Sequence, residues 1–198
     1  MEKVKFEIKR KVLHVIVGLF FIFSIKYDII KPFDIFVLLL SVVFLSLISR
    51  KINVPLWSYF INNFEREEFK KKYPGKGLIF LIFGVLATYK LFEKNIALAS
   101  ISILTFMDSF VSVFGVLLKE KFNMRSKEKL ILVELLGFVI AFFSANIFVS
   151  PVEALIAAFG AILAEYYEIE VNKSQVDDNF IVPLAAASSI VIFRKLTI

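Results

Sequence analysis

The sequence of 198 residues contains no cysteine, which excludes a disulfide framework and thiol chemistry. It also lacks internal repeats and low-complexity tracts. We expect no cleavable signal at the N-terminus, because the apolar stretch 12–24 contains His14 and lacks a clear small-residue cleavage site. The long apolar runs are continuous and do not alternate with polar residues, which favours membrane helices over a membrane β-barrel.

The composition is that of an integral membrane protein. Hydrophobic residues make up 59% of the chain, with a mean hydropathy of +0.79 and 24 phenylalanines, whereas soluble domains are roughly 45–50% apolar. The length fits one domain, so residues 1–198 are expected to form a single transmembrane domain. The net charge of +6 does not indicate nucleic acid as a partner, because the basic residues cluster beside apolar spans.

Seven apolar segments approach the roughly 20 residues that cross a bilayer. They predict an all-α fold, a polytopic helical bundle of about seven transmembrane helices. A six-span alternative leaves 77–92 or 179–196 on the membrane surface. Pro32 and Pro151 mark tight turns between consecutive spans. The segments are 12–31, 33–49, 77–92, 95–118, 130–149, 151–169 and 179–196.

The basic residues are distributed asymmetrically among the connecting segments. Eighteen lysines and arginines lie in the N-terminus and in the loops 50–76, 119–129 and 170–178, against six in the alternating set. Cytoplasmic loops carry the excess of basic residues in membrane proteins. The distribution therefore predicts a multi-pass protein with a cytoplasmic N-terminus.

The long hydrophilic loop 50–76 is predicted to be cytoplasmic. Residues 54–64 are rich in aromatic side chains suited to the membrane interface, and residues 65–72 carry mixed charge with helical spacing. Two interpretations remain open. The loop forms an amphipathic helix lying on the membrane, or it is a solvated connector.

Asp108 is the candidate functional residue that stands out first. It is the only charged residue in the 24 residues 95–118. A carboxylate in the middle of a membrane helix costs about 2.5–3.5 kcal/mol on insertion scales, and it is tolerated mainly where it faces a wet cavity, a partner or an ion. The structural alternative is a buried Asp108 that is hydrogen-bonded by Ser109, Ser112 or a neighbouring helix.

Further polar residues are predicted to lie at the same cytoplasmic side. Arg10, Lys11 and His14 share a helical face with Glu7 and Gly18, because they are spaced by three and four residues. Basic residues at this position are also ordinary orientation signals. A lone interfacial histidine is more often structural than functional.

Three predicted helix starts at this side carry phosphate- or metal-binding chemistry. Lys76–Gly77 and the run 125–129 combine basic groups with backbone N–H groups or a hydroxyl, which favours anions. Asp177–Asn179, with Glu165 in the preceding span, offers hard oxygen ligands for Mg²⁺ on a nucleotide polyphosphate. The structural alternatives are a positive-inside loop and ordinary helix capping.

In order along the chain, these residues form a set of short motifs that resembles the dolichol kinase and phytol kinase family of CTP-dependent membrane lipid-alcohol kinases, relatives of phosphatidate cytidylyltransferases. The resemblance extends from about Glu7 to Pro183. The chain has Met107–Asp108 where the family usually has Gly-Asp. It has the run 125–129, R-S-K-E-K, where the family usually has K-S-x-E-G. The motifs are R-K-x-x-H-x-x-x-G (Arg10, Lys11, His14, Gly18), K-G (Lys76, Gly77), D-x-x-x-x-x-x-G (Asp108, Gly115), R-S-x-E (Arg125, Ser126, Glu128) and E…D-D-N (Glu165, Asp177, Asp178, Asn179).

The resemblance implies a single catalytic domain that transfers the terminal phosphate of a nucleoside triphosphate, usually CTP, to the hydroxyl of a polyprenol, dolichol, phytol-like alcohol or diacylglycerol. A divalent cation, Mg²⁺ or another, is implied as cofactor. Asp108 and the pair Asp177/Asp178 are expected to hold the metal, and His14 or Asp108 to accept the alcohol proton. The remaining motif residues are expected to bind or to position the nucleotide: Arg10, Lys11, Lys76, Gly77, Arg125, Ser126 and Glu128, with Glu165 and Asn179 beside them.

Two alternatives from other classes remain. The same scaffold could transfer a cytidylyl group to a phosphorylated lipid, in which case pyrophosphate is released instead of CDP. A transporter would use Asp108 and Glu134 as intramembrane carboxylates, and it would not require cations aligned on one face.

Overall fold

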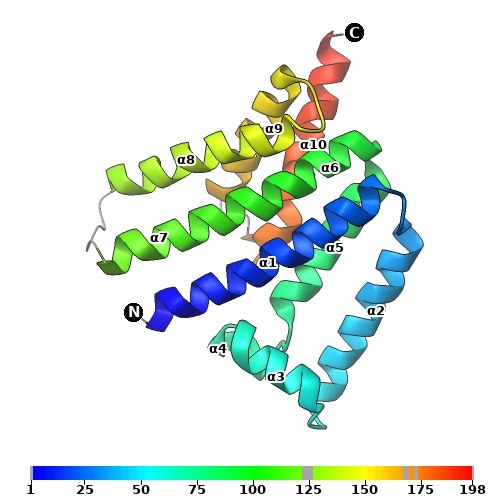
Figure 1. The fold of residues 1–198 in the computed structure, drawn as a ribbon, viewed down its shortest axis with the longest axis vertical. Helices are drawn as coiled ribbons and strands as arrows, with labels where there is room; N and C mark the ends of the chain where they lie inside the picture. Colours follow the sequence, from blue (N-terminus) through cyan, green and yellow to red (C-terminus); the bar gives the residue numbers. More distant parts are fainter. Residues whose placement is uncertain (1, 122–126, 167–169, 172–173, 198) are drawn as a thin grey trace.

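The protein is helical in a computed structural model that describes residues 2–121, 127–166, 170–171 and 174–197. The predicted all-α class is confirmed, and the described strands are an antiparallel pair of two residues each. Figure 1 shows the arrangement. The elements are α1 (Glu2–Lys26), α2 (Pro32–Ser49), α3 (Pro55–Phe64), α4 (Glu67–Lys70), α5 (Lys76–Leu91), α6 (Lys94–Ile103), the π-helix η1 (Leu104–Asp108), α7 (Ser109–Lys121), α8 (Lys127–Ala145), α9 (Pro151–Tyr166), β1 (Glu170–Val171), β2 (Ser174–Gln175) and α10 (Asp178–Thr197).

Each predicted apolar segment corresponds to a helix, although the ends differ. The largest difference is in α1, which begins ten residues before the predicted segment 12–31 and ends at Lys26. The charged N-terminal residues continue the helix, and two of them, Glu7 and Lys11, are buried on the same face as Gly18. The helix ends where Asp28 adopts a left-handed conformation with φ 55° and the Ile29 N–H bonds back to the Ser24 carbonyl at 2.8 Å.

In the described parts of the chain, three helical stretches are long and apolar enough to cross a membrane: Pro32–Ser49, Lys94–Glu120 and Asp178–Thr197. A fourth, Ile131–Ala145, is apolar but shorter. Many large apolar side chains point outward, including Phe33, Phe44 and Phe143. An outer surface of this kind is suited to lipid.

Proline and short polar side chains account for several helix starts. Pro32 and Pro151 stand at the first position of α2 and α9, where a missing N–H costs nothing. The Asp34 carboxylate accepts the Lys31 N–H at 2.8 Å. In the same way Glu153 accepts the Ser150 N–H at 2.9 Å. These capping contacts satisfy backbone groups that the first turn would otherwise leave unpaired.

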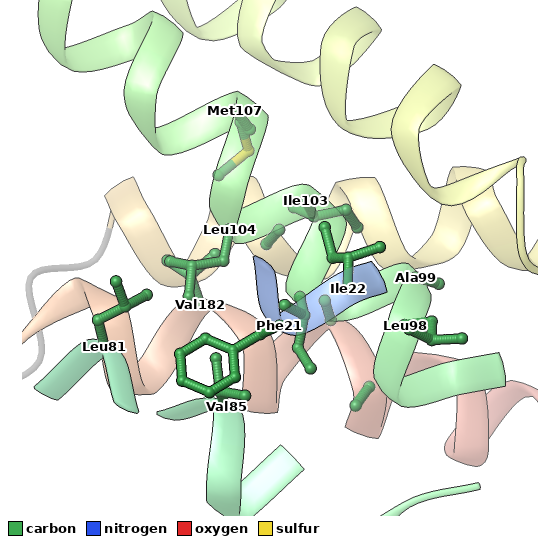
Figure 2. Packing of buried hydrophobic residues seen from close by; sticks show 14 of the residues in the cluster. Phe21, Ile22, Leu81, Val85, Leu98, Ala99, Ile103, Leu104, Met107 and Val182 are labelled. Carbon is green, nitrogen blue, oxygen red and sulfur yellow. The ribbon is translucent and has the colours of Figure 1, made fainter. Parts of the chain in front are cut away.

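The core is organised around α6 and η1. All residues from Ile96 to Leu104 are buried, and α6 packs against α1, α5, α8, α9 and α10. Figure 2 shows Phe21 of α1, Val85 of α5 and Val182 of α10 meeting beside Leu104. The segment that carries Asp108 is thus held by helices on several sides.

Two glycines allow the helix approaches that shape the site. A Cβ added at Gly18 would collide with the side chain of Thr105, so α1 can lie against η1 only with glycine there. A Cβ added at Gly84 would collide with the Asn179 carbonyl oxygen, so α5 meets the start of α10 by the same means. Both contacts bring polar residues of separate helices toward Asp108.

Candidate functional site

Asp108 ends the π-helix η1 and lies in a closely packed polar cluster. Its carboxylate is paired with the ammonium group of Lys11, and its Oδ2 lies 3.5 Å from His14 Nε2. The Ser112 hydroxyl donates to its Oδ1 at 3.4 Å. Asp108 is only 6% exposed and Lys11 only 5%. A buried ion pair of this kind is weak evidence for stability, and π-helical turns occur frequently at functional sites.

The predicted polar face of α1 is present and is directed at this cluster. Lys11 and His14 lie two turns and one turn before Gly18, where α1 touches η1. His14 Nε2 also lies 3.4 Å from the Leu104 carbonyl oxygen. Arg10, on the neighbouring flank, is paired with Glu7. The close contact at Gly18 therefore determines which α1 side chains reach Asp108.

The starts of α5 and α10 form the second part of the site. Lys76 Nζ lies 3.8 Å from Asp177 Oδ2 and 4.2 Å from the centre of the Phe69 ring. Asp177 Oδ1 accepts the Asn179 backbone N–H at 3.2 Å and its side-chain amide at 2.8 Å. Asp177 thus performs the capping role that was considered as an alternative, and its other oxygen faces Lys76.

A polar cavity of about 150 Å³ connects these groups. Its walls come from α1, the α3–α4 region, α5, α7 and the start of α10. Eight of the thirteen predicted site residues lie on this wall: Arg10, Lys11, Lys76, Gly77, Asp108, Asp177, Asp178 and Asn179. Residues that are up to 169 positions apart in the sequence therefore surround one space, as the common-face prediction requires.

A smaller cavity of about 50 Å³ adjoins the polar one. Most of its wall is apolar and comes from three helices, with Val17 on α1, Phe60 and Phe64 on α3, and Leu81 on α5. His14 also lies on this wall. The two cavities share four lining residues: Arg10, Glu65, Gly77 and Asn179. A ligand with one charged end and one apolar end could therefore occupy both.

Glu65 is a site residue that the sequence did not reveal, and its neighbours Arg66, Glu68 and Phe69 also line the polar cavity without having been predicted. It lies between α3 and α4, is 6% exposed, and accepts the Arg66 N–H at 3.1 Å and the Gly77 N–H at 3.4 Å. Burial raises the pKa of its carboxyl group. It opens a run of alternating charge, which is typical of a solvated surface, so no local signal distinguished it from Glu67 or Glu68.

Some predicted residues fall outside the cavity or outside the described parts of the chain. Arg125 and Ser126 are not described, and Glu128 lies in the first turn of α8 without a described side chain. Glu165 belongs to α9 and is not among the described residues that line the polar cavity. One of its carboxylate oxygens is buried without a hydrogen-bond partner, as is one of Glu134 on α8.

Lys11 is predicted to bind nucleotide phosphate. In the structure it lines the polar cavity, and its ammonium group contacts Asp108, the predicted metal ligand. The physical reason is that two opposite charges withdrawn from water are stabilised most by each other. Within the described residues, no three or more His, Asp or Glu side chains lie together as a ready metal site. Mg²⁺ commonly uses one or two carboxylates plus substrate phosphates, and the carboxylates on the cavity wall fit that mode of binding.

Comparison with known proteins gives one similar sequence. The chain is 29% identical over 186 residues to a protein of Methanocaldococcus jannaschii named "Uncharacterized protein MJ1137", and the match covers 91% of each chain. No family model matches the sequence, and no solved structure gives a significant match. The name of the similar protein states no activity, so the function must be argued from the site.

Proposed function

We propose that the protein is a membrane lipid-alcohol kinase. It transfers the terminal phosphate of a nucleoside triphosphate to the hydroxyl group of a polyprenol, dolichol or phytol-like alcohol, with CTP as the donor that the family resemblance implies. The observation that supports this most strongly is the pair of adjoining cavities, one polar and one apolar, with shared walls at Arg10, Glu65, Gly77 and Asn179.

The charges on the polar wall suit phosphoryl transfer. This reaction depends on positioning and on electrostatic stabilisation of the phosphate oxygens, with little covalent chemistry by the protein. Arg10, Lys11 and Lys76 supply three cations around one space. In this proposal the polyphosphate of the nucleotide takes the place of Asp108 as the partner of Lys11. The Asp108 carboxylate is then free to bind the divalent cation or to accept the alcohol proton.

A divalent cation would be held by Asp108 together with Asp177 or Asp178, which line the same cavity. When bound, Mg²⁺ supplies charge neutralisation for the phosphate oxygens. The protein residues position the two substrates and exclude water. His14 and Asp108 are the candidate bases for the alcohol proton, because His14 lines the apolar cavity, Asp108 lines the polar one, and His14 Nε2 lies 3.5 Å from Asp108 Oδ2.

We further propose a seven-span topology with the N-terminus and the site at the cytoplasmic side. Two clusters of charge support this arrangement. The starts of α5 and α10 meet at Lys76 and Asp177. At the other ends of the helices, Lys94 pairs with Asp28 at 2.6 Å, and Arg194 pairs with Glu93 at 2.7 Å. In this proposal the strongly basic segments lie at the end of the bundle from which the nucleotide arrives.

The test is a transfer assay on the purified protein with CTP labelled either in the γ-phosphate or in the cytidine. A panel of lipid alcohols serves as acceptor. The kinase predicts γ-label in the lipid and labelled CDP in solution. Cytidine label in the lipid would identify a cytidylyltransferase instead, and no transfer to any alcohol, with Mg²⁺ or another divalent cation present, would contradict the proposal.

A further inference from the structure

The apolar cavity lies beneath a short helix on the same side as the proposed nucleotide site. Helix α3 contacts α1 and α2, and in Figure 1 it lies below α1 and beside the lower end of α2. Its Phe60 and Phe64 rings are tilted against each other with centres 5.4 Å apart and form one wall. Leu13 and Val17 of α1 form another wall.

The third wall belongs to α5, through Leu78 and Leu81. The inner end is polar, where Arg10, Glu65 and Asn179 continue into the polar cavity. A hydrocarbon chain between the three helices would therefore direct its head group at the cations of the site. The apolar walls favour such a chain because burying it removes its surface from water.

Glu65 has the chemistry needed to receive the head of an alcohol. An ionised carboxylate offers about four acceptor positions, and its two hydrogen bonds within the described residues come from the backbone N–H groups of Arg66 and Gly77. Acceptor capacity therefore remains for a hydroxyl at the junction of the cavities. Among the residues that the structure describes, Glu65 is the one carboxylate that lines both of them.

We propose that the cavity between α1, α3 and α5 binds the first part of a single hydrocarbon chain, and that Glu65 accepts a hydrogen bond from the hydroxyl at its end. This inference rests on the proposed kinase function, assigns the acceptor to a particular cavity and residue, and excludes diacylglycerol, which the family resemblance had left open. Diacylglycerol would bring two ester groups against Leu13, Val17 and Leu81, where the side chains offer no hydrogen-bond donor, and burying unpaired polar groups is costly.

The test uses a long-chain primary alcohol that carries a photoreactive diazirine on the third carbon from the hydroxyl. The purified full-length protein is irradiated with it in lipid nanodiscs without nucleotide, and the labelled peptides are identified by mass spectrometry. We expect labelling around Leu13–Val17 and Phe60–Phe64. An unlabelled single-chain alcohol should compete, and diacylglycerol at the same concentration should not.

Two neighbouring positions on α1 provide a matched pair of variants. Val17→Trp fills the cavity, whereas Ile16→Trp adds the same side chain to the outer face, where Ile16 is 58% exposed. We expect at least a tenfold loss of cavity labelling and a tenfold higher apparent KM for the alcohol in Val17→Trp, with the KM for CTP unchanged. The Ile16→Trp variant should stay within twofold of the wild type. Val17→Ala serves as a second variant that leaves folding intact and should accept bulkier alcohols.

The outcomes separate this inference from the kinase proposal. A protein that phosphorylates alcohols but is labelled only on its outer faces, or equally competed by diacylglycerol, overturns the inference and leaves the kinase function. A protein labelled in the cavity that transfers no phosphate keeps the binding site and overturns the kinase function.

Discussion

The two ends of the helical bundle both carry ion pairs between helices, but in opposite environments. At the site end, Lys11 and Asp108 are almost completely withdrawn from solvent. At the other end, the side chains of Asp28 and Glu93 are 73% and 74% exposed. Asp28 pairs with Lys94 at 2.6 Å, and Glu93 pairs with Arg194 at 2.7 Å. Ion pairs between helices therefore occur in a closed site at one end and at the exposed Asp28 and Glu93 side chains at the other.

The difference shows what each end is organised to do. An exposed ion pair contributes about 0–1 kcal/mol and is easily replaced. A buried pair is costly to assemble, and removing one partner leaves an uncompensated charge. The exposed end accordingly fits a role in joining helix ends, whereas the buried pair is explained by a function that needs charge at that depth.

The largest effect is expected from Asp108→Asn. This change keeps the volume but leaves the Lys11 ammonium without its partner, which should lower the free energy of unfolding by about 3–5 kcal/mol. Phosphate transfer should fall by orders of magnitude in the protein that remains folded. Thermal unfolding in detergent measures the loss of stability. Transfer from labelled CTP, expressed per folded molecule, measures the loss of activity. A folded and active variant would reject the functional role.

The second-largest effect is expected from a change in the packing of α5 against α10. Gly84→Ala places a Cβ against the Asn179 carbonyl oxygen, which must separate α5 from α10. We expect a loss of about 1–3 kcal/mol of unfolding free energy, as for other overpacked cores, together with weaker nucleotide binding. Gly115→Ala is the control, because a Cβ there meets no neighbouring atom within 4 Å. Equal stability of the two variants would show that the close approach at Gly84 is not required.

The buried carboxyl group of Glu65 predicts that the free energy of unfolding depends on pH. Burial raises its pKa in the folded protein above the ordinary value of 4.5. Above pH 4.5 the unfolded chain therefore releases a proton that the folded chain still holds, so the free energy of unfolding falls as pH rises toward the raised pKa. Glu65→Gln should lose this component, and thermal unfolding measured across the range would show a flatter profile. Glu67→Gln, whose side chain is 88% exposed, should keep the wild-type profile.

The smallest effect is expected at the exposed end. Arg194→Ala removes contacts to Glu93 at 2.7 Å and Glu153 at 2.6 Å. The Glu93 side chain is 74% exposed, and Glu153 keeps hydrogen bonds from the Ser150 N–H and hydroxyl. The free energy of unfolding should therefore change by about 0–1 kcal/mol, and phosphate transfer should not change. A loss comparable to that of Asp108→Asn would contradict the comparison between the two ends.

Much of the fold was predictable from the apolar segments, because seven continuous runs leave the backbone few options other than helix. The helical ends were less predictable. α1 extends ten residues beyond its apolar segment and packs against α7 and η1, and the hydropathy of the charged residues does not indicate this contact. The number of helices that cross the membrane and the orientation of the N-terminus remain predictions.

The candidate site was predictable where residues repeat on one helix, as on α1, and where an unusual residue stands alone, as Asp108 does. The pairing of Lys11 with Asp108 was not, because it depends on the approach of α1 and η1 at Gly18. Glu65 was missed for the same reason. Its burial comes from the packing of α3 beside α1, and nothing in its own sequence neighbourhood indicates that contact.

The central claim is that the buried Lys11–Asp108 pair is maintained for chemistry and not for stability. The most direct measurement uses the double variant Lys11→Met/Asp108→Leu, with unfolding and phosphate transfer followed in the same preparation. Replacing a buried ion pair by apolar side chains is often neutral or stabilising by about 1–4 kcal/mol. We therefore predict a protein at least as stable as the wild type that transfers no phosphate. A double variant that retains transfer, or one that is as unstable as Asp108→Asn alone, would contradict the claim.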